Sequence, residues 1–162
     1  MSSGRSWLTA LMFLGLVGLH FTLRPILDWR AGVDFLVVAV LLVAVRVRPG
    51  TAALVGFLLG LVADALTPEA FGAGALAMTV VGFGASTLKA AFFAENVALN
   101  AVFVFVGKLV HDVVFLLAER RLSGLTLVTQ MFWWTPLAAL VTALVGLLVM
   151  TLLRPTLERR RL

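Results

Sequence analysis

The sequence predicts an all-α integral membrane protein, built as a bundle of about six transmembrane helices. The first observation is composition: of 162 residues, 62% are hydrophobic and only 13% are charged, and the mean hydropathy is +1.10. Soluble domains are typically ~45–50% apolar and ~25% charged. So few charges could not cover this much apolar side chain in water, whereas lipid can serve as the outer solvent.

The second observation is that the apolar residues fall into six runs, each separated from the next by proline, glycine or charge. The expected spans are 6–23, 34–47, 51–66, 72–89, 96–118 and 131–153. Six spans of ~20 residues would use ~120 positions, so we expect one membrane domain with short loops. The first run exceeds the apolar core of a cleavable signal and is expected to stay in place. The short second run needs snorkelling arginines or local thinning, and a five-span form stays open.

The basic residues predict the orientation. With the N-terminus inside, eight lie on the inner side and four on the outer side: Arg5, Arg46, Arg48, Lys89, Arg154, Arg159, Arg160 and Arg161 against Arg24, Arg30, Arg120 and Arg121. This excess favours both termini in the cytoplasm. The sequence shows no aromatic and basic patch for stacking bases, so we expect contact with lipid and not with nucleic acid.

The third run carries a face of small residues that ends in an acid. Gly56, Gly60 and Asp64 are four residues apart, and small residues at this spacing let another helix approach closely. Asp64 could cap the N-terminus of a helix starting near Gly72, pair with a base, or mark the water boundary. Packing or capping is favoured over a catalytic or ion-carrying role.

Two further groups call for an explanation. Lys108, His111 and Asp112 share one face of the fifth run. They form an intramembrane polar seam that serves as a contact for a partner helix, as an internal ion pair or, less favoured, as part of a proton relay. Trp133 and Trp134 begin the sixth run, where tryptophan is typical of an anchor at the membrane surface, and a binding groove is the less favoured alternative.

The residues argue against an enzyme. An intramembrane serine protease is not supported, because no glycine follows Ser86 and the sixth run contains no histidine. An intramembrane aspartyl protease is not supported either, because neither Asp64 nor Asp112 stands in a Gly-x-Gly-Asp context. Cysteine is absent, and no spacing supplies three zinc ligands. We therefore expect no catalytic residue, no metal and no cofactor.

One stretch carries a resemblance to a known family. It comprises Gly56-Phe57-x-x-Gly60-Leu61-x-x-Asp64, a short loop, and Phe71-Gly72-Ala73-Gly74-Ala75-Leu76 followed by a glycine-containing helix. This stretch resembles the bacterial rod-shape-determining membrane protein MreD, and the size, the six runs and the basic tail fit the same family. Gly72 and Gly74 therefore join Gly56, Gly60 and Asp64 as expected packing or partner residues.

The resemblance implies a non-enzymatic scaffold of the cell-wall elongation complex. It implies binding to the single-span protein MreC and, indirectly, to MreB, RodA and a class B penicillin-binding protein. It also implies a helix arrangement similar to the substrate-binding S-components of energy-coupling-factor vitamin transporters. A transporter subunit that binds a small molecule such as a vitamin is the alternative, and a homodimer stays open.

Overall fold

The computed structural model describes residues 11, 13–23, 32–66, 70–92, 97–119 and 124–158, and within them the chain is helical and contains no strand. A helix at Phe13–Leu23 precedes α2 (Phe35–Ala44), α3 (Pro49–Ala65), α4 (Ala73–Phe92) and α5 (Val97–Glu119). The last helix runs through α6 (Leu125–Thr129), the π-helix η2 (Gln130–Trp134) and α7 (Thr135–Glu158) without a break. The all-α prediction is confirmed for these residues.

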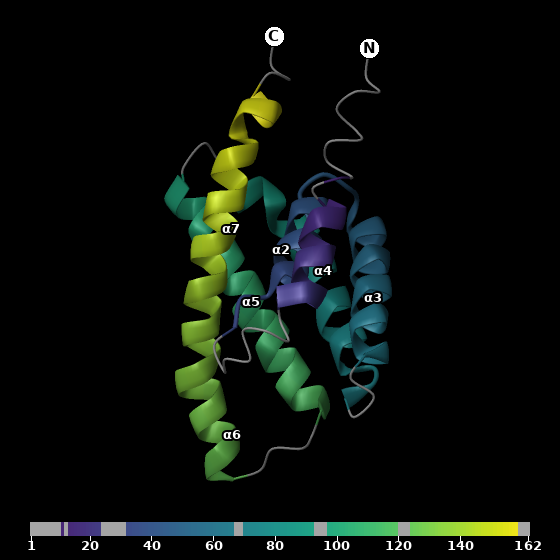
Figure 1. Ribbon diagram of the computed structural model, residues 1–162, viewed down its shortest axis with the longest axis vertical. Coiled ribbons are helices and arrows are strands. Elements are labelled where there is room, and N and C mark those ends of the chain that lie inside the picture. Colours follow the sequence, from purple (N-terminus) through teal and green to yellow (C-terminus); the bar gives the residue numbers. More distant parts are fainter. Residues whose placement is uncertain are drawn as a thin grey trace.

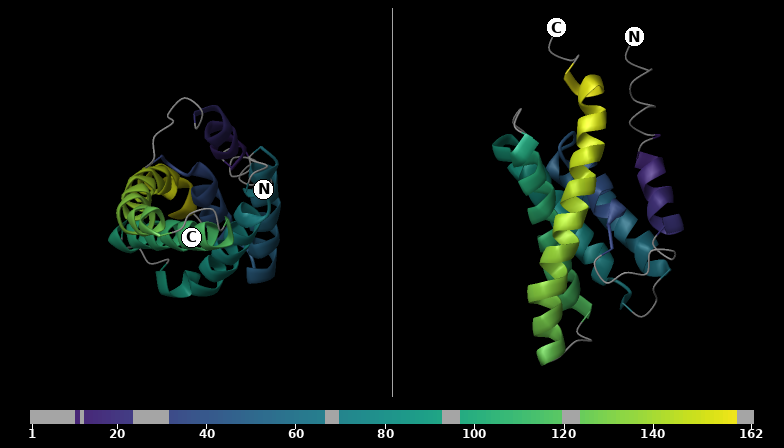
Figure 2. Two further views of the ribbon diagram at one scale, coloured as in Figure 1. Left: turned by 90° about the horizontal axis from the view of Figure 1, so that it is seen from below. Right: turned by 60° about the vertical axis from the view of Figure 1, so that its left-hand side comes forward.

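The shortest of these helices forms the centre of the bundle (Figure 1). α2 carries only apolar residues, and Leu36, Val37 and Leu41 are each 0–1% exposed. A helix that is hydrophobic on every side has no face to turn toward water, and it is therefore surrounded by other helices. Views from a second and third direction show the neighbouring helices arranged around it (Figure 2).

The N-terminus of α2 lies inside the bundle. Ten residues at 1.5 Å each make a helix of ~15 Å, about half the thickness of a hydrocarbon core. Figure 1 shows that α2 begins part-way along the bundle and ends near its upper end. Asp34 caps this buried end, because its Oδ1 accepts hydrogen bonds from the backbone amides of Leu36 and Val37 at 3.2 Å.

α3 and α4 form a tightly packed antiparallel pair (Figure 1). α3 starts at Pro49, whose missing amide hydrogen costs nothing in the first turn of a helix. The chain turns back through Gly72, whose φ of +94° favours glycine. A Cβ atom on Gly60 would lie 2.5 Å from Cα of Ala75, so glycine at this position sets the distance between the two helices.

Two helices are long and apolar enough to cross a membrane, judged by length and composition: Ala98–Glu119 and Leu125–Val149. The other apolar helices are shorter, at Phe13–Leu23, Phe35–Ala44, Pro49–Ala65 and Ala73–Lys89. Large apolar side chains are exposed on every described helix except α2, among them Leu14, Leu58, Phe83, Leu117 and Leu148. The apolar residues thus lie on the outside of the bundle as well as in its core.

The helices differ from the expected runs mainly at the second and the last run, and α4 and α7 also extend to Phe92 and Glu158, beyond the expected ends at 89 and 153. The last helix begins at Leu125 and not at Met131, because Thr126 to Gln130 continue the helix into the π-helical turn. The second run gives a helix from Phe35 to Ala44 only, because Asp34 caps it at one end and Pro49 starts the next helix. Residues 6–10 and 12 of the first expected span lie outside the described part of the chain.

Candidate functional site

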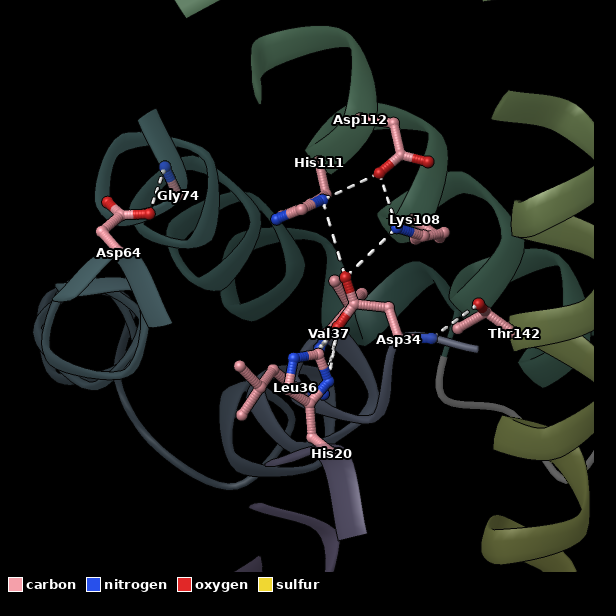
Figure 3. Close-up of polar contacts among 10 residues, drawn as sticks. All are labelled: His20, Asp34, Leu36, Val37, Asp64, Gly74, Lys108, His111, Asp112 and Thr142. Atoms are coloured by element: carbon pink, nitrogen blue, oxygen red, sulfur yellow. Dashed lines mark hydrogen bonds and ion pairs between the residues drawn. The ribbon is translucent and has the colours of Figure 1, made fainter. Parts of the chain in front are cut away.

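Five ionisable side chains meet at the buried start of α2, and we call them the central charged cluster: His20, Asp34, Lys108, His111 and Asp112 (Figure 3). They come from the helix Phe13–Leu23, from the N-cap of α2 and from one face of α5. The spacing in α5 places Lys108, His111 and Asp112 on successive turns of the same face, as the sequence predicts.

Lys108 lies between the two carboxylates. Its Nζ is 2.6 Å from Oδ1 of Asp112 and 3.2 Å from Oδ2 of Asp34. The side chains of Lys108, Asp34 and Asp112 are only 8%, 14% and 15% exposed. At such burial the attraction between opposite charges is much stronger than in water, and so is the cost of leaving one of them uncompensated.

The two histidines extend the cluster along both sides of Asp34. Nδ1 of His111 is 2.9 Å from Oδ1 of Asp112 and 4.0 Å from Oδ2 of Asp34. Because its neighbours are carboxylate oxygens, Nδ1 of His111 must carry a hydrogen. His20 is 2% exposed, and its Nδ1 is 3.6 Å from Oδ1 of Asp34.

A hydroxyl on α7 completes the connection. The backbone amide of Asp34 donates a hydrogen bond of 3.2 Å to Oγ1 of Thr142, which is fully buried. Asp34 thereby contacts three elements besides its own: the helix Phe13–Leu23, α5 and α7 (Figure 3). The cluster is therefore suited to holding these helices together at one point. Within the described residues, no group of three His, Asp or Glu side chains could hold a metal ion.

A second site joins the end of α3 to the start of α4, and we call Gly56, Gly60, Asp64, Gly72 and Gly74 the glycine–aspartate joint. Oδ2 of Asp64 accepts hydrogen bonds of 2.9 Å from the amides of Gly72 and Ala75. Oδ1 accepts one of 3.1 Å from the amide of Gly74. Amides at a helix N-terminus lack partners within the helix, so this carboxylate satisfies them.

The geometry of the joint decides between the alternatives that the sequence left open for Asp64. The side chain is 2% exposed, so it does not mark the water boundary, and its contacts are backbone amides and not a base. The prediction that it caps the helix near Gly72 is confirmed. A Cβ atom on Gly56 would clash with the backbone of Met78, and one on Gly74 would clash with the carboxylate of Asp64. Both positions therefore require glycine.

Sequence reasoning found only part of the central charged cluster. It placed Lys108, His111 and Asp112 on one face, and their contacts are with each other and Asp34 inside the bundle. It missed the roles of Asp34, His20 and Thr142. One local signal was present, because an aspartate directly before a long apolar run is typical of a helix N-cap.

Trp133 lies at the far end of the bundle from the C-terminus of α7 and is 77% exposed, with Phe132 at 74%. Both belong to η2, whose extra residue per turn shifts the direction of the side chains that follow. Trp134 is half-buried.

Fold and site together define an all-helical bundle with apolar side chains outside and a charged cluster inside. No protein-family model matches the chain, and no curated protein or solved structure matches it either.

Proposed function

We propose that this chain is a multi-pass protein of the bacterial inner membrane and a non-enzymatic scaffold subunit of the cell-wall elongation complex. In this proposal it resembles MreD, binds MreC directly and is linked through MreC to MreB, RodA and a class B penicillin-binding protein. The similarity to S-components of vitamin transporters stays a prediction.

The membrane location is supported by the distribution of side chains between the surface and the interior. Leu54, Leu76, Val106 and Leu144 are among the large apolar residues exposed on four helices, whereas Lys108 and Asp64 are buried. A soluble protein shows the reverse arrangement, because water solvates charges and excludes apolar surface. The helices α5 and α7, at ~35 Å each, are long enough to cross the hydrocarbon core.

The scaffold role is supported by one observation: the glycine–aspartate joint, on which the resemblance rests, is closely packed and hydrogen-bonded across its two helices. Glycines at 56 and 60 permit backbone contact between α3 and α4, and Asp64 fixes the register through three amide hydrogen bonds. The joint holds the apolar outer faces of two helices in a defined relation. A partner with a transmembrane helix needs such a fixed surface, because helices in lipid associate through close packing.

The decisive experiment is co-purification from membranes. A tagged copy of the chain is expressed with MreC, extracted in mild detergent and captured, and we expect MreC in the eluate. Gly60→Leu, which separates α3 from α4, is expected to recover less MreC per captured chain, with the amount of captured chain measured in each sample. Gly18→Leu, on the helix Phe13–Leu23 and away from α3 and α4, is the control, because a Cβ on Gly18 meets no atom within 4 Å.

Depletion in the host tests the biological role. We expect cells to widen and to lose lateral wall synthesis as the chain is depleted. Unchanged cell width together with no recovery of MreC would contradict the proposal. Tight binding of one vitamin by the purified chain would replace it with the transporter alternative.

A further inference from the structure

The turn between α2 and α3 is attached to the end of α4 through a single carbonyl group. The backbone oxygen of Val47 accepts a hydrogen bond of 2.7 Å from Oγ of Ser86 and another of 2.8 Å from Nζ of Lys89. Val47 and Lys89 are far apart in sequence, so this contact brings a cation of α4 beside the turn. Ser86 is 2% exposed, and its hydrogen bond holds the turn against α4.

Three basic side chains gather at this place, and we call Arg46, Arg48 and Lys89 the basic corner. Arg46 and Arg48 are exposed and stand on either side of Val47 in the turn. The first turn of α3 contains no acidic residue, and the last turn of α4 contributes Lys89. Figure 1 shows that α2 ends, α3 begins and α4 ends at the same end of the bundle.

An apolar surface continues from the basic corner along α3. Leu54, Leu58 and Val62 are 57%, 52% and 51% exposed, and their spacing of four residues places them on one side of the helix. The buried residues of α3 are Ala52, Gly56, Gly60 and Asp64, on its opposite side. Arg46 and Arg48 therefore stand at the end of α3 from which this apolar surface runs, and Lys89 lies beside Val47 on α4, which packs against the opposite side of α3.

We infer that the basic corner binds the phosphate headgroup of an anionic lipid, whose acyl chains lie along Leu54, Leu58 and Val62. Each guanidinium offers donors that match phosphate oxygens, and the ammonium of Lys89 has donors besides the one given to Val47. A free phosphate ion would use the cations but not the apolar surface along α3. Basic sites between helices on the cytoplasmic side are typical places for anionic headgroups.

This inference rests on the membrane location within the proposed function and not on the binding of MreC. The test uses the full chain purified in a neutral detergent. Native mass spectrometry measures the retention of phosphatidylglycerol and of phosphatidylcholine with identical acyl chains. We expect phosphatidylglycerol to bind at least about tenfold more tightly, and the difference to shrink as salt is added.

The variant Arg46→Gln/Arg48→Gln removes two cations and leaves both hydrogen bonds to Val47 in place. At about fivefold in affinity for each basic residue near a charged headgroup, we expect phosphatidylglycerol binding to fall roughly 25-fold. Arg120→Gln/Arg121→Gln, which removes the same charge from the segment after α5, is the matched control and is expected to bind like the unaltered chain. Circular dichroism establishes that both variants are folded, and Arg48→Gln alone, at an exposed position, provides a second and milder variant.

Three outcomes would overturn the inference. The first is equal binding of the two lipids by the unaltered chain, and the second is an equal loss of binding in the two double variants. The third is displacement of the lipid by inorganic phosphate at the same concentration, which would assign the corner to a free anion. Any of these with MreC still co-purifying refutes the lipid site alone, whereas failure of the chain to fractionate with membranes refutes the location on which both ideas depend.

Discussion

Asp34 and Lys108 are separated by 74 positions, yet Oδ2 of one lies 3.2 Å from Nζ of the other inside the bundle. Asp34 begins α2 and Lys108 lies in the middle of α5, so this pair fixes how deep the central helix sits. The Asp112 carboxylate holds the same ammonium from the next turn of α5. Lys108 thus holds the start of α2 together with Thr142 of α7 and His20.

Replacing that lysine is the first prediction. Lys108→Met leaves the carboxylates of Asp34 and Asp112 buried without their shared cation, and breaking a buried ion pair in this way typically costs about 3–5 kcal/mol. We expect a clearly lower midpoint of thermal unfolding in detergent, followed by circular dichroism. Adding Asp34→Asn, which still caps α2, is expected to recover part of the loss. Strictly additive effects of the two substitutions would count against the ion pair.

The Asp64 carboxylate gives the second prediction. Asp64→Leu orphans the amides of Gly72, Gly74 and Ala75, and each buried unpaired group costs about 1–3 kcal/mol. We expect lower protein levels in membranes and weaker partner binding than for Glu158→Leu at the end of α7. Asp64→Asn retains one acceptor oxygen and is expected to fall between the two. Equal levels for Asp64→Leu and Glu158→Leu would refute the structural role of the cap.

Two glycines inside helices, Gly60 and Gly84, should respond differently to substitution by alanine. A methyl group on Gly60 would lie 2.5 Å from Cα of Ala75, whereas one on Gly84 meets nothing within 4 Å. We expect Gly60→Ala to destabilise the bundle by about 1–3 kcal/mol through overpacking. Gly84→Ala should be neutral or stabilise by up to about 1 kcal/mol, because alanine favours the helix. The unfolding midpoints of the two variants, measured side by side, decide the matter.

The orientation in the membrane can be measured with introduced cysteines, because the chain has none of its own. Thr51 and Leu125 are both exposed and lie near opposite ends of the bundle. With the termini in the cytoplasm, Leu125→Cys should react with an impermeant maleimide on intact cells. Thr51→Cys should react only after the membrane is opened. The reverse pattern would invert the proposed orientation.

Trp133 is the subject of the fifth prediction. Its exposure of 77% on η2 leads us to expect an indole at the level of the lipid headgroups. A variant that keeps Trp133 as its single tryptophan, reconstituted with brominated lipids, should be quenched most by bromine close to the headgroups. Strongest quenching by bromine at the ends of the acyl chains would place the indole deep in the bilayer instead.

Helix positions and helix contacts differ in how far the sequence predicts them. The apolar runs predicted the helices because periodicity and composition act locally. The spacing of Gly56, Gly60 and Asp64 predicted a face for the close approach of another helix, and the structure shows that this helix is α4. Asp34 was not recognised as a partner of Lys108, nor His20 as a neighbour of Asp34. Their meeting depends on the arrangement of three separate elements, which no local pattern encodes.

The π-helical turn at Gln130–Trp134 was likewise not foreseen. Its residues fit a regular α-helix by propensity, and the extra residue in the turn arises where α6 and α7 join into one helix. The early start of this helix at Leu125 is a second difference: residues 125–134 contain no proline or glycine, and the helix continues through them to Pro136 in the first turn of α7.

The burial of α2, in which every residue except Val43 is buried, has a consequence for genetics. No partner, lipid or ligand at the surface can contact a helix whose residues Val37, Val38 and Ala39 are 0% exposed. Substitutions there can act only by changing the amount of folded chain, and their defects should be rescued by overproduction. Substitutions on the outer faces of α3 and α4 can abolish an interaction at normal abundance. Loss-of-function alleles should therefore fall into two groups, those that overproduction rescues and those that it does not. The substitutions in the second group should map to the surface that binds the partner.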